Sequence, residues 1–340
     1  MMNALLPLLA AAAPRLCDTR SKPAAWEHVG PAGYDDGKGG IASAGAAQAA
    51  VHLNGTEWLL ATANGGIWKT EDITASPEPS WTQVLDASPV TCTSISAMSE
   101  AVAGTVLAGC GAATSSEMGY EWDVANSGDW TGVMLSRDAG QTWVMTRFPA
   151  NRYVSALLVL DADTFVVGVR SELFLPLTGG VYKSTDGGKS WTQVFSQPVF
   201  DLRYRAPHLL AAVPWAKHAS ASLYVSPDGG DTFAPWAAGL DWGGHVPYYP
   251  TFAVGEAVVF VGALTVDPKN LSDTSSALFV RDLAELPAPS GAQGAAGAWR
   301  AVAHAPRLDE DGMPKDRMAL LVDPTSDARL FVAGNAGALA

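Results

Sequence analysis

The sequence is short of positive charge. Only 21 of its 340 residues are Lys or Arg, whereas 34 are Asp or Glu, so the formal net charge is −13. Nucleic acids and anionic membrane surfaces bind proteins through a basic face. The composition therefore argues against both as partners.

Long apolar runs and helical patterns are also missing. The apolar run at residues 4–13 is too short to cross a bilayer, so we expect no membrane insertion. We interpret residues 1–16 as a secretory signal and 17–25 as a linker, which predicts an exported or secreted protein. The alternatives are a disordered start or a misassigned one. No long stretch shows the 3.6-residue spacing of an amphipathic helix.

Motifs for cofactor chemistry are absent as well. The six His residues show no metal-ligand spacing, and the chain contains neither a phosphate-binding loop nor a nucleophile elbow. We therefore expect no metal and no cofactor.

Cysteine is scarce, with only three residues: Cys17, Cys92 and Cys110. If a hairpin is centred on Ala101, Cys92 and Cys110 are equidistant from its turn and face each other, close enough for a disulfide. Two buried free thiols are the alternative.

Glycine, by contrast, is plentiful, and it recurs in three near-copies of one octet, Ser-x-Asp-x-Gly-x-(Ser/Thr)-aromatic. Each copy stands between two short apolar runs, as a hairpin turn does. The Asp can accept hydrogen bonds from turn amides, the Gly can adopt positive φ, and the aromatic residue can enter an apolar layer. The conserved positions of the three turns are Ser136, Asp138, Gly140 and Trp143; Ser184, Asp186, Gly188 and Trp191; and Ser226, Asp228, Gly230 and Phe233.

The spacing of these turns predicts the fold. Successive turn aspartates are 48 and 42 residues apart, which suits a four-stranded propeller blade. We expect an all-β, six-bladed β-propeller of antiparallel blades in one domain, residues 26–340. The blades span about 51–84, 91–146, 153–196, 199–238, 251–302 and 317–340, and the strand at 26–29 completes the last one. The fifth blade retains a degraded turn, Val280-Arg281-Asp282. A seven-bladed or truncated propeller is the alternative.

The octets resemble the Asp-box (BNR) repeats of the sialidase superfamily. The phrases at 62–70 and 26–31 are most similar to its sortilin-like and xyloglucanase-like branch. The resemblance implies that the Asp-boxes lie on one face of the propeller and that ligands bind on the other, around the central channel. Sialidase activity is not expected, because the aromatic-Arg-Ile-Pro motif of that family is approximated only by Tyr204-Arg205-Ala206-Pro207, which follows two boxes.

The segments expected on the channel face combine aromatic and acidic residues, which suit the faces and hydroxyls of sugar rings. The ligand-binding candidates are Tyr120, Trp122, Trp130, Trp215, Trp242, His245 and Tyr248. A carboxylate pair is also what glycoside hydrolysis needs, and the candidates are Asp35, Asp36, Glu121, Asp123 and Asp241. The competing interpretation is that these side chains only pack and solvate long loops.

Three functions follow as hypotheses. The first is an exported, monomeric propeller that binds a glycan or a protein across its channel face without catalysis. The second is a glycoside hydrolase of the xyloglucanase-like type. The third is an assembly or scaffold factor, against which the acidic composition counts.

Overall fold

The computed structural model of the chain describes residues 34–35, 41–42, 47–63, 65–86, 88–90, 92–111, 130–172, 179–214, 222–237, 239–286, 298–302, 319–323, 326–334 and 337–339. These residues fall into two compact units, one spanning His28–Pro235 and one containing Trp236–Ala340.

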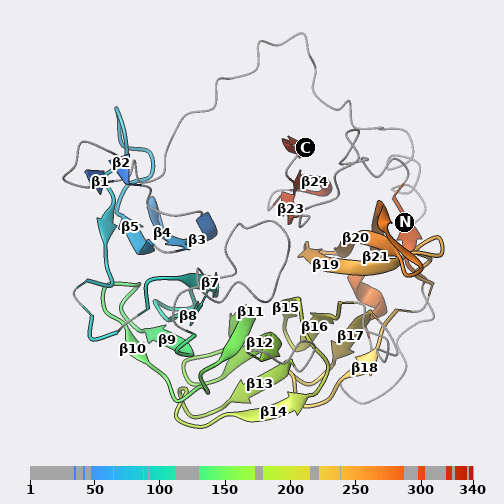
Figure 1. The fold of residues 1–340 in the computed structure, drawn as a ribbon, viewed down its shortest axis with the longest axis horizontal. Coiled ribbons are helices and arrows are strands. Elements are labelled where there is room, and N and C mark those ends of the chain that lie inside the picture. Colours follow the sequence, from blue (N-terminus) through green and yellow to red (C-terminus); the bar gives the residue numbers. More distant parts are fainter. Residues whose placement is uncertain are drawn as a thin grey trace. The chain divides into compact units, whose positions relative to one another are not determined.

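The unit His28–Pro235 contains four sheets in chain order, each an antiparallel meander of four strands (Figure 1). Short apolar strands alternate with turns rich in Gly, Asp and Ser, which is why neighbouring strands pair in sequence order. The first sheet is β3 (Ala47–Asn54), β4 (Glu57–Thr62), β5 (Gly66–Thr70) and β6 (Thr82–Gln83); the second is β7 (Ile95–Met98), β8 (Val106–Cys110), β9 (Val133–Ser136) and β10 (Val144–Met145). The third is β11 (Arg152–Val159), β12 (Phe165–Glu172), β13 (Gly180–Ser184) and β14 (Thr192–Phe195); the fourth is β15 (Asp201–Arg205), β16 (His208–Ala212), β17 (Leu223–Ser226) and β18 (Ala234–Pro235). A small sheet pairs β1 (Tyr34–Asp35) with β2 (Ile41–Ala42).

The unit containing Trp236–Ala340 holds the remaining two sheets. The fifth sheet is β19 (Val246–Val254), β20 (Val258–Asp267), β21 (Asn270–Asp282) and β22 (Arg300–Ala301), with the 3-10 helix η1 (Leu283–Glu285) after β21. The sixth has three strands among the described residues, β23 (Ala319–Asp323), β24 (Ser326–Gly334) and β25 (Gly337–Leu339). Leu278, Leu320 and Val322 are among the buried residues of the apolar cluster in this unit.

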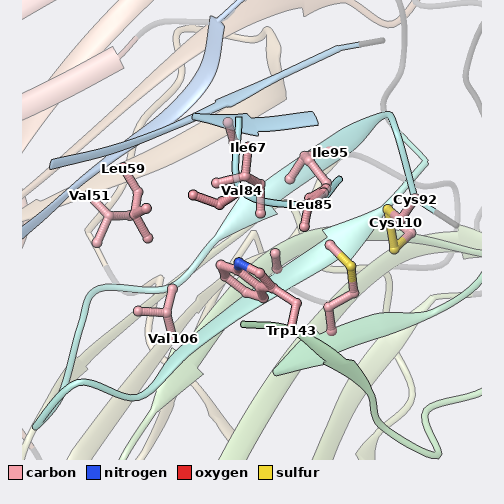
Figure 2. Packing of buried hydrophobic residues seen from close by; sticks show 13 residues of the cluster. Val51, Leu59, Ile67, Val84, Leu85, Cys92, Ile95, Val106, Cys110 and Trp143 are labelled. Atoms are coloured by element: carbon pink, nitrogen blue, oxygen red, sulfur yellow. A yellow bond between two sulfur atoms is a disulfide. The ribbon is translucent and has the colours of Figure 1, made fainter. Parts of the chain in front are cut away.

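Apolar side chains fill the space between consecutive sheets of His28–Pro235. The first cluster joins the first and second sheets and includes Leu59, Ile67, Ile95 and the fully buried Trp143 (Figure 2). Further along, Phe148 packs edge-to-face on Trp191, and Phe195 lies 4.8 Å from Phe233 between ring centroids. The aromatic residue that closes each octet is therefore part of the packing between sheets.

The chain contains a disulfide between Cys92 and Cys110, with a Cα–Cα distance of 5.8 Å. Both residues are buried at the edge of the first cluster (Figure 2). The expected register is wrong, however. The hairpin is centred between Ala103 and Gly104, where Val102 and Thr105 bridge its tip, instead of on Ala101. A bulge between Ile95 and Ala97 shifts the pairing by one residue, and Cys110 lies opposite Ile95. Cys92 reaches its partner from just before β7.

The prediction of an all-β chain built from four-stranded antiparallel sheets is confirmed. The strand expected at 26–29 lies outside the described residues, and so do the signal and linker segments at 1–25.

Candidate functional site

The three octets form near-identical turns, each at the point where the third strand of a sheet leads into the fourth. In the turn after β13, the Ser184 hydroxyl accepts a hydrogen bond from the Gly188 amide (2.9 Å) and donates one to Asp186 (2.9 Å). The other carboxylate oxygen of Asp186 accepts from the Ser190 hydroxyl at 2.6 Å. The turns of Ser136 and Ser226 repeat these contacts.

These contacts keep the turn carboxylates ionised. Hydrogen bonds from the Ser190 hydroxyl and amide lower the pKa of Asp186 to about 2. Partial burial raises the pKa of Asp228, but hydrogen bonds led by the Thr232 hydroxyl outweigh it and lower the value to about 2. The pKa of Asp138 is lowered by the same balance. A carboxylate this acidic is a poor general acid or base near neutral pH, so these residues stabilise turns.

The same end of the sheets carries ion pairs from one sheet to the next. Arg137, in the turn of the second sheet, donates to the Ala162 carbonyl at 2.7 Å and pairs with Asp163 of the third at 3.2 Å. Lys183 of the third sheet pairs with Asp231 of the fourth at 2.6 Å. We call this end of the sheets the turn end.

Strand register defines the opposite end. Ser184 pairs with Phe165 at the start of β12, whereas Glu172 at its other end pairs with Arg152. The chain also passes from second to third strand at this opposite end. Residues 112–129, 173–178 and 215–221 make that connection in the second, third and fourth sheets and lie outside the described residues.

Aromatic and arginine side chains line the opposite end across three sheets. Trp130 packs edge-to-face on Tyr153, with ring centroids 5.8 Å apart. The guanidinium carbon of Arg170 lies 5.7 Å from the centroid of the Tyr153 ring and 5.5 Å from that of Phe200. Arg170 is only 8% exposed, and Phe200 is half-buried. We call these four residues the aromatic–arginine belt.

Of the predicted ligand-binding residues, only Trp130 lies in the belt. It is buried, and its indole covers the backbone of Gly111, which has positive φ, so a Cβ there would collide with the ring. Trp130 therefore packs against the backbone of the second sheet and presents little surface to solvent. The Thr131 hydroxyl beside it is buried and has no hydrogen-bond partner among the residues that the structure describes.

Three further candidates meet in one turn before β19. The Asp241 carboxylate accepts from the Gly243 amide at 2.9 Å, and the His245 amide donates to the Trp242 carbonyl at 3.2 Å. Trp242 is half-buried and packs edge-to-face on Phe279 at 5.0 Å. Asp241 is thus engaged in closing its own turn.

For the other candidates, the structure describes the backbone alone or nothing. Asp35 lies in β1 and Tyr248 in β19, each by backbone only. Asp36, Tyr120, Glu121, Trp122, Asp123 and Trp215 lie outside the described residues.

Sequence reasoning missed Tyr153, Arg170 and Phe200. Their one visible signal is an arginine at the end of the apolar run 165–169, where a strand facing two sheets would ordinarily continue with apolar residues. Arg152, which stacks on Tyr182 at 5.7 Å, begins the neighbouring strand at the same end.

In the part of the chain that the structure describes, no three His, Cys, Asp or Glu side chains come together as metal ligands would. The described residues also include no helix of the length and apolarity needed to cross a membrane.

Comparison with known proteins gives matches among solved structures. No protein-family model matches the chain, and neither does any curated protein. An ancestral GH74 enzyme matches at 14% identity and a TM-score of 0.57, over 87% of this chain and 37% of that one. A GH74 enzyme from Niastella koreensis matches at 15% and 0.55, over 85% and 40%. The GH74 xyloglucanase from Xanthomonas campestris matches at 18% and 0.54, over 85% and 42%.

This chain therefore spans about two fifths of the length of these enzymes. At such low identity the likeness shows a common β-propeller fold, and it says nothing about activity, because one fold hosts many.

Proposed function

We propose that this chain is a β-propeller that binds a glycan at the end of its sheets opposite the turn end, without cleaving it. The aromatic–arginine belt is the observation that carries the proposal. It runs through three consecutive sheets at the end where the connections 112–129, 173–178 and 215–221 are attached.

The chemistry of this end suits a sugar. Aromatic rings bury the apolar faces of pyranoses, while guanidinium groups and hydroxyls bond to their oxygens. The attached connections contribute Tyr120, Trp122 and Trp215. Because the belt residues are largely buried, we assign them the role of a rigid base, and we assign ligand contact to these three side chains.

The turn carboxylates are not the candidates for a catalytic pair. Asp138, Asp186 and Asp228 are engaged by their own turns, and Asp241 closes the turn before β19.

A glycan array with the folded, labelled protein tests the proposal, and calorimetry on each hit then measures affinity. Trp122→Ala and Trp215→Ala should each weaken binding by about two- to tenfold, as loss of one stacking contact does. Lys189→Ala, an exposed change at the turn end, is the matched control and should leave affinity unchanged. Binding of peptides but no glycan would refute the ligand class, and equal losses in all three variants would refute the location.

A glycoside hydrolase of the xyloglucanase-like type is the second candidate. It is supported by the shared fold with three GH74 enzymes, over 85–87% of this chain. Its carboxylate pair would come from Asp35, Asp36, Glu121 and Asp123, since Asp241 is engaged in its own turn. Release of reducing ends from xyloglucan by the wild type, lost in Glu121→Gln and Asp123→Asn, would establish hydrolysis. Binding without release would dismiss it.

For the architecture, we propose six blades, with the strand at 26–29 pairing with β25 to complete the sixth. Deleting residues 1–29 should then lower the melting temperature and promote self-association, because it would leave a sheet edge open. An unchanged melting temperature and a monomeric deletion variant would contradict this closure.

We also propose that the protein is exported after removal of residues 1–16. The intact mass of the exported protein tests this cleavage.

A further inference from the structure

The fifth sheet replaces the Ser-x-Asp turn with a different structure. In the second, third and fourth sheets, one residue of the third strand pairs with the first residue of the fourth strand. The serine of the octet comes directly after that paired residue, at Ser136, Ser184 and Ser226. In the fifth sheet, Val280 makes that pair with Arg300, so Arg281 occupies the serine position. The degraded turn predicted from the sequence, Val280-Arg281-Asp282, put Val280 at the serine position, and that prediction is wrong by one residue.

Arg281 forms a buried cluster with two tryptophans and one acid. Its Nε donates to Glu285 at 3.0 Å, and its guanidinium carbon lies 4.8 Å from the centroid of the Trp236 ring. Trp299 packs edge-to-face on Trp236 at 4.9 Å, and its indole donates to the Trp236 carbonyl at 3.0 Å. The indoles of Trp143 and Trp191 instead donate within their own octets, so this cluster has a bonding scheme of its own.

Two donors of the cluster have no acceptor among the described residues. Within the described part of the chain, neither Nη1 of Arg281 nor Nε1 of Trp236 has a hydrogen-bond partner, and both atoms are buried. The residues are only 5% and 6% exposed. Buried donors in native proteins are nearly always bonded, and a buried guanidinium more so than most. Two unmet donors on one stacked pair therefore point to an acceptor that binds there.

We propose that Arg281 and Trp236 form a binding site for a small oxyanion, a carboxylate or a phosphate. The guanidinium carbon of Arg281 lies 4.8 Å from the centroid of the Trp236 ring, so both unmet donors belong to one stacked pair. An oxyanion offers at least two acceptor oxygens, one for each donor. The guanidinium of Arg281 favours an anionic acceptor, because its N–H groups bond carboxylate and phosphate oxygens more strongly than neutral ones. Its Nε pairs with Glu285, so the oxyanion would bond Nη1.

This site is distinct from the proposed glycan-binding end. All four side chains belong to the unit containing Trp236–Ala340, and they lie where that sheet carries its third-to-fourth strand connection. Failure of glycan binding would leave the oxyanion proposal standing, and the reverse also holds.

Indole N–H resonances test the proposal directly. The protein is labelled with 15N at tryptophan, the Trp236 signal is assigned with Trp236→Phe, and formate or phosphate is added at constant ionic strength. We expect the Trp236 signal to shift and to saturate, while the Trp299 signal, already bonded, moves little. No saturable shift with either oxyanion, or an equal shift with chloride, would overturn the proposal.

Substitutions test the contribution of each donor to oxyanion binding separately. Trp236→Phe keeps the ring and removes the N–H, so calorimetry should show affinity for the oxyanion about tenfold lower, the loss of one hydrogen bond. Arg281→Lys should abolish saturation, whereas Arg300→Lys, an exposed change in the pair with Asp282, should not alter it. If Arg281→Lys does not fold, Trp236→Phe decides the outcome, and an unchanged affinity in that variant refutes the site.

Discussion

Replacing Gly140 by Ala should destabilise the unit His28–Pro235 far more than the same change at Gly229. Both glycines have positive φ, +78° and +70°, so both substitutions strain the backbone. They differ in what surrounds the new methyl group. A Cβ at Gly140 would lie 2.7 Å from both Cδ atoms of the fully buried Leu59, whereas a Cβ at Gly229 would meet nothing within 4 Å.

The octets themselves show that the two positions differ. The residue before the conserved glycine is Ala139 in the second sheet, with φ of +57°, but Gly187 and Gly229 in the next two. An alanine is therefore accommodated at that position. The following position is glycine in all three octets, because there the side chain would enter the packing between sheets.

The loss of stability in each variant is the sum of the backbone strain and the overpacking. Left-handed backbone costs alanine about 1–2 kcal/mol, and reduced freedom of the unfolded chain returns about 0.4–1 kcal/mol. Gly229→Ala should thus cost about 0–1.6 kcal/mol. Overpacking against Leu59 adds about 1–3 kcal/mol, which brings Gly140→Ala to about 1–4.6 kcal/mol. Gly188 and Gly230, with nearest side-chain atoms at 2.9 and 3.4 Å, should fall between them in that order.

Urea unfolding followed by tryptophan fluorescence measures the difference. With a slope of about 3 kcal/mol per M, Gly140→Ala should lower the midpoint by about 1 M (range about 0.3–1.5 M) and Gly229→Ala by at most about 0.5 M. Both substitutions lie in one unit and so report on the same transition. Equal midpoints in the two variants, or a lower one for Gly229→Ala, would refute the steric argument.

Three further predictions concern the same unit. Replacing both Cys92 and Cys110 by Ala should cost about 3 kcal/mol, the value for closing a loop of this length, and thiol titration of the unfolded, unreduced wild type should find one reactive Cys. Ser184→Ala should cost about 1–3 kcal/mol in urea, because the buried Gly188 amide loses its acceptor, while the exposed Ser190→Ala should cost less. The pKa values of Asp186 and Asp228, about 2 in the folded state, lie below the ordinary 3.8, so the stability they contribute is present above pH 4 and is lost as the pH falls towards 2. Urea midpoints at pH 5, 4, 3 and 2 should decline, and Asp228→Asn should flatten the decline; a midpoint independent of pH would contradict the linkage.

Local features of this protein were predictable from the sequence. The turn of Ser184 closes through contacts between residues at most four positions apart, so its residue types alone predict the turn. The regular spacing of such turns then predicts sheets of four strands, because each turn joins the third strand to the fourth. The disulfide shows the limit of this reasoning. The hairpin is centred between Ala103 and Gly104 and not on Ala101, so the expected register was wrong from its tip onward. A bulge between Ile95 and Ala97 then shifts it by one residue, and the residue types on either side do not indicate the bulge.

Only the tertiary structure brings together the residues proposed for binding. The belt combines Trp130, Tyr153, Arg170 and Phe200 from three sheets, and the oxyanion site combines Trp236 with Arg281, 45 positions later in the chain. No short-range pattern marks such pairs, since their contact depends on strand register and on how one sheet packs against the next. The sequence by itself determined the turns, the strands and their order, because those depend on neighbours in the chain. Which arginine lies over which ring was decided by packing between strands that are distant in sequence.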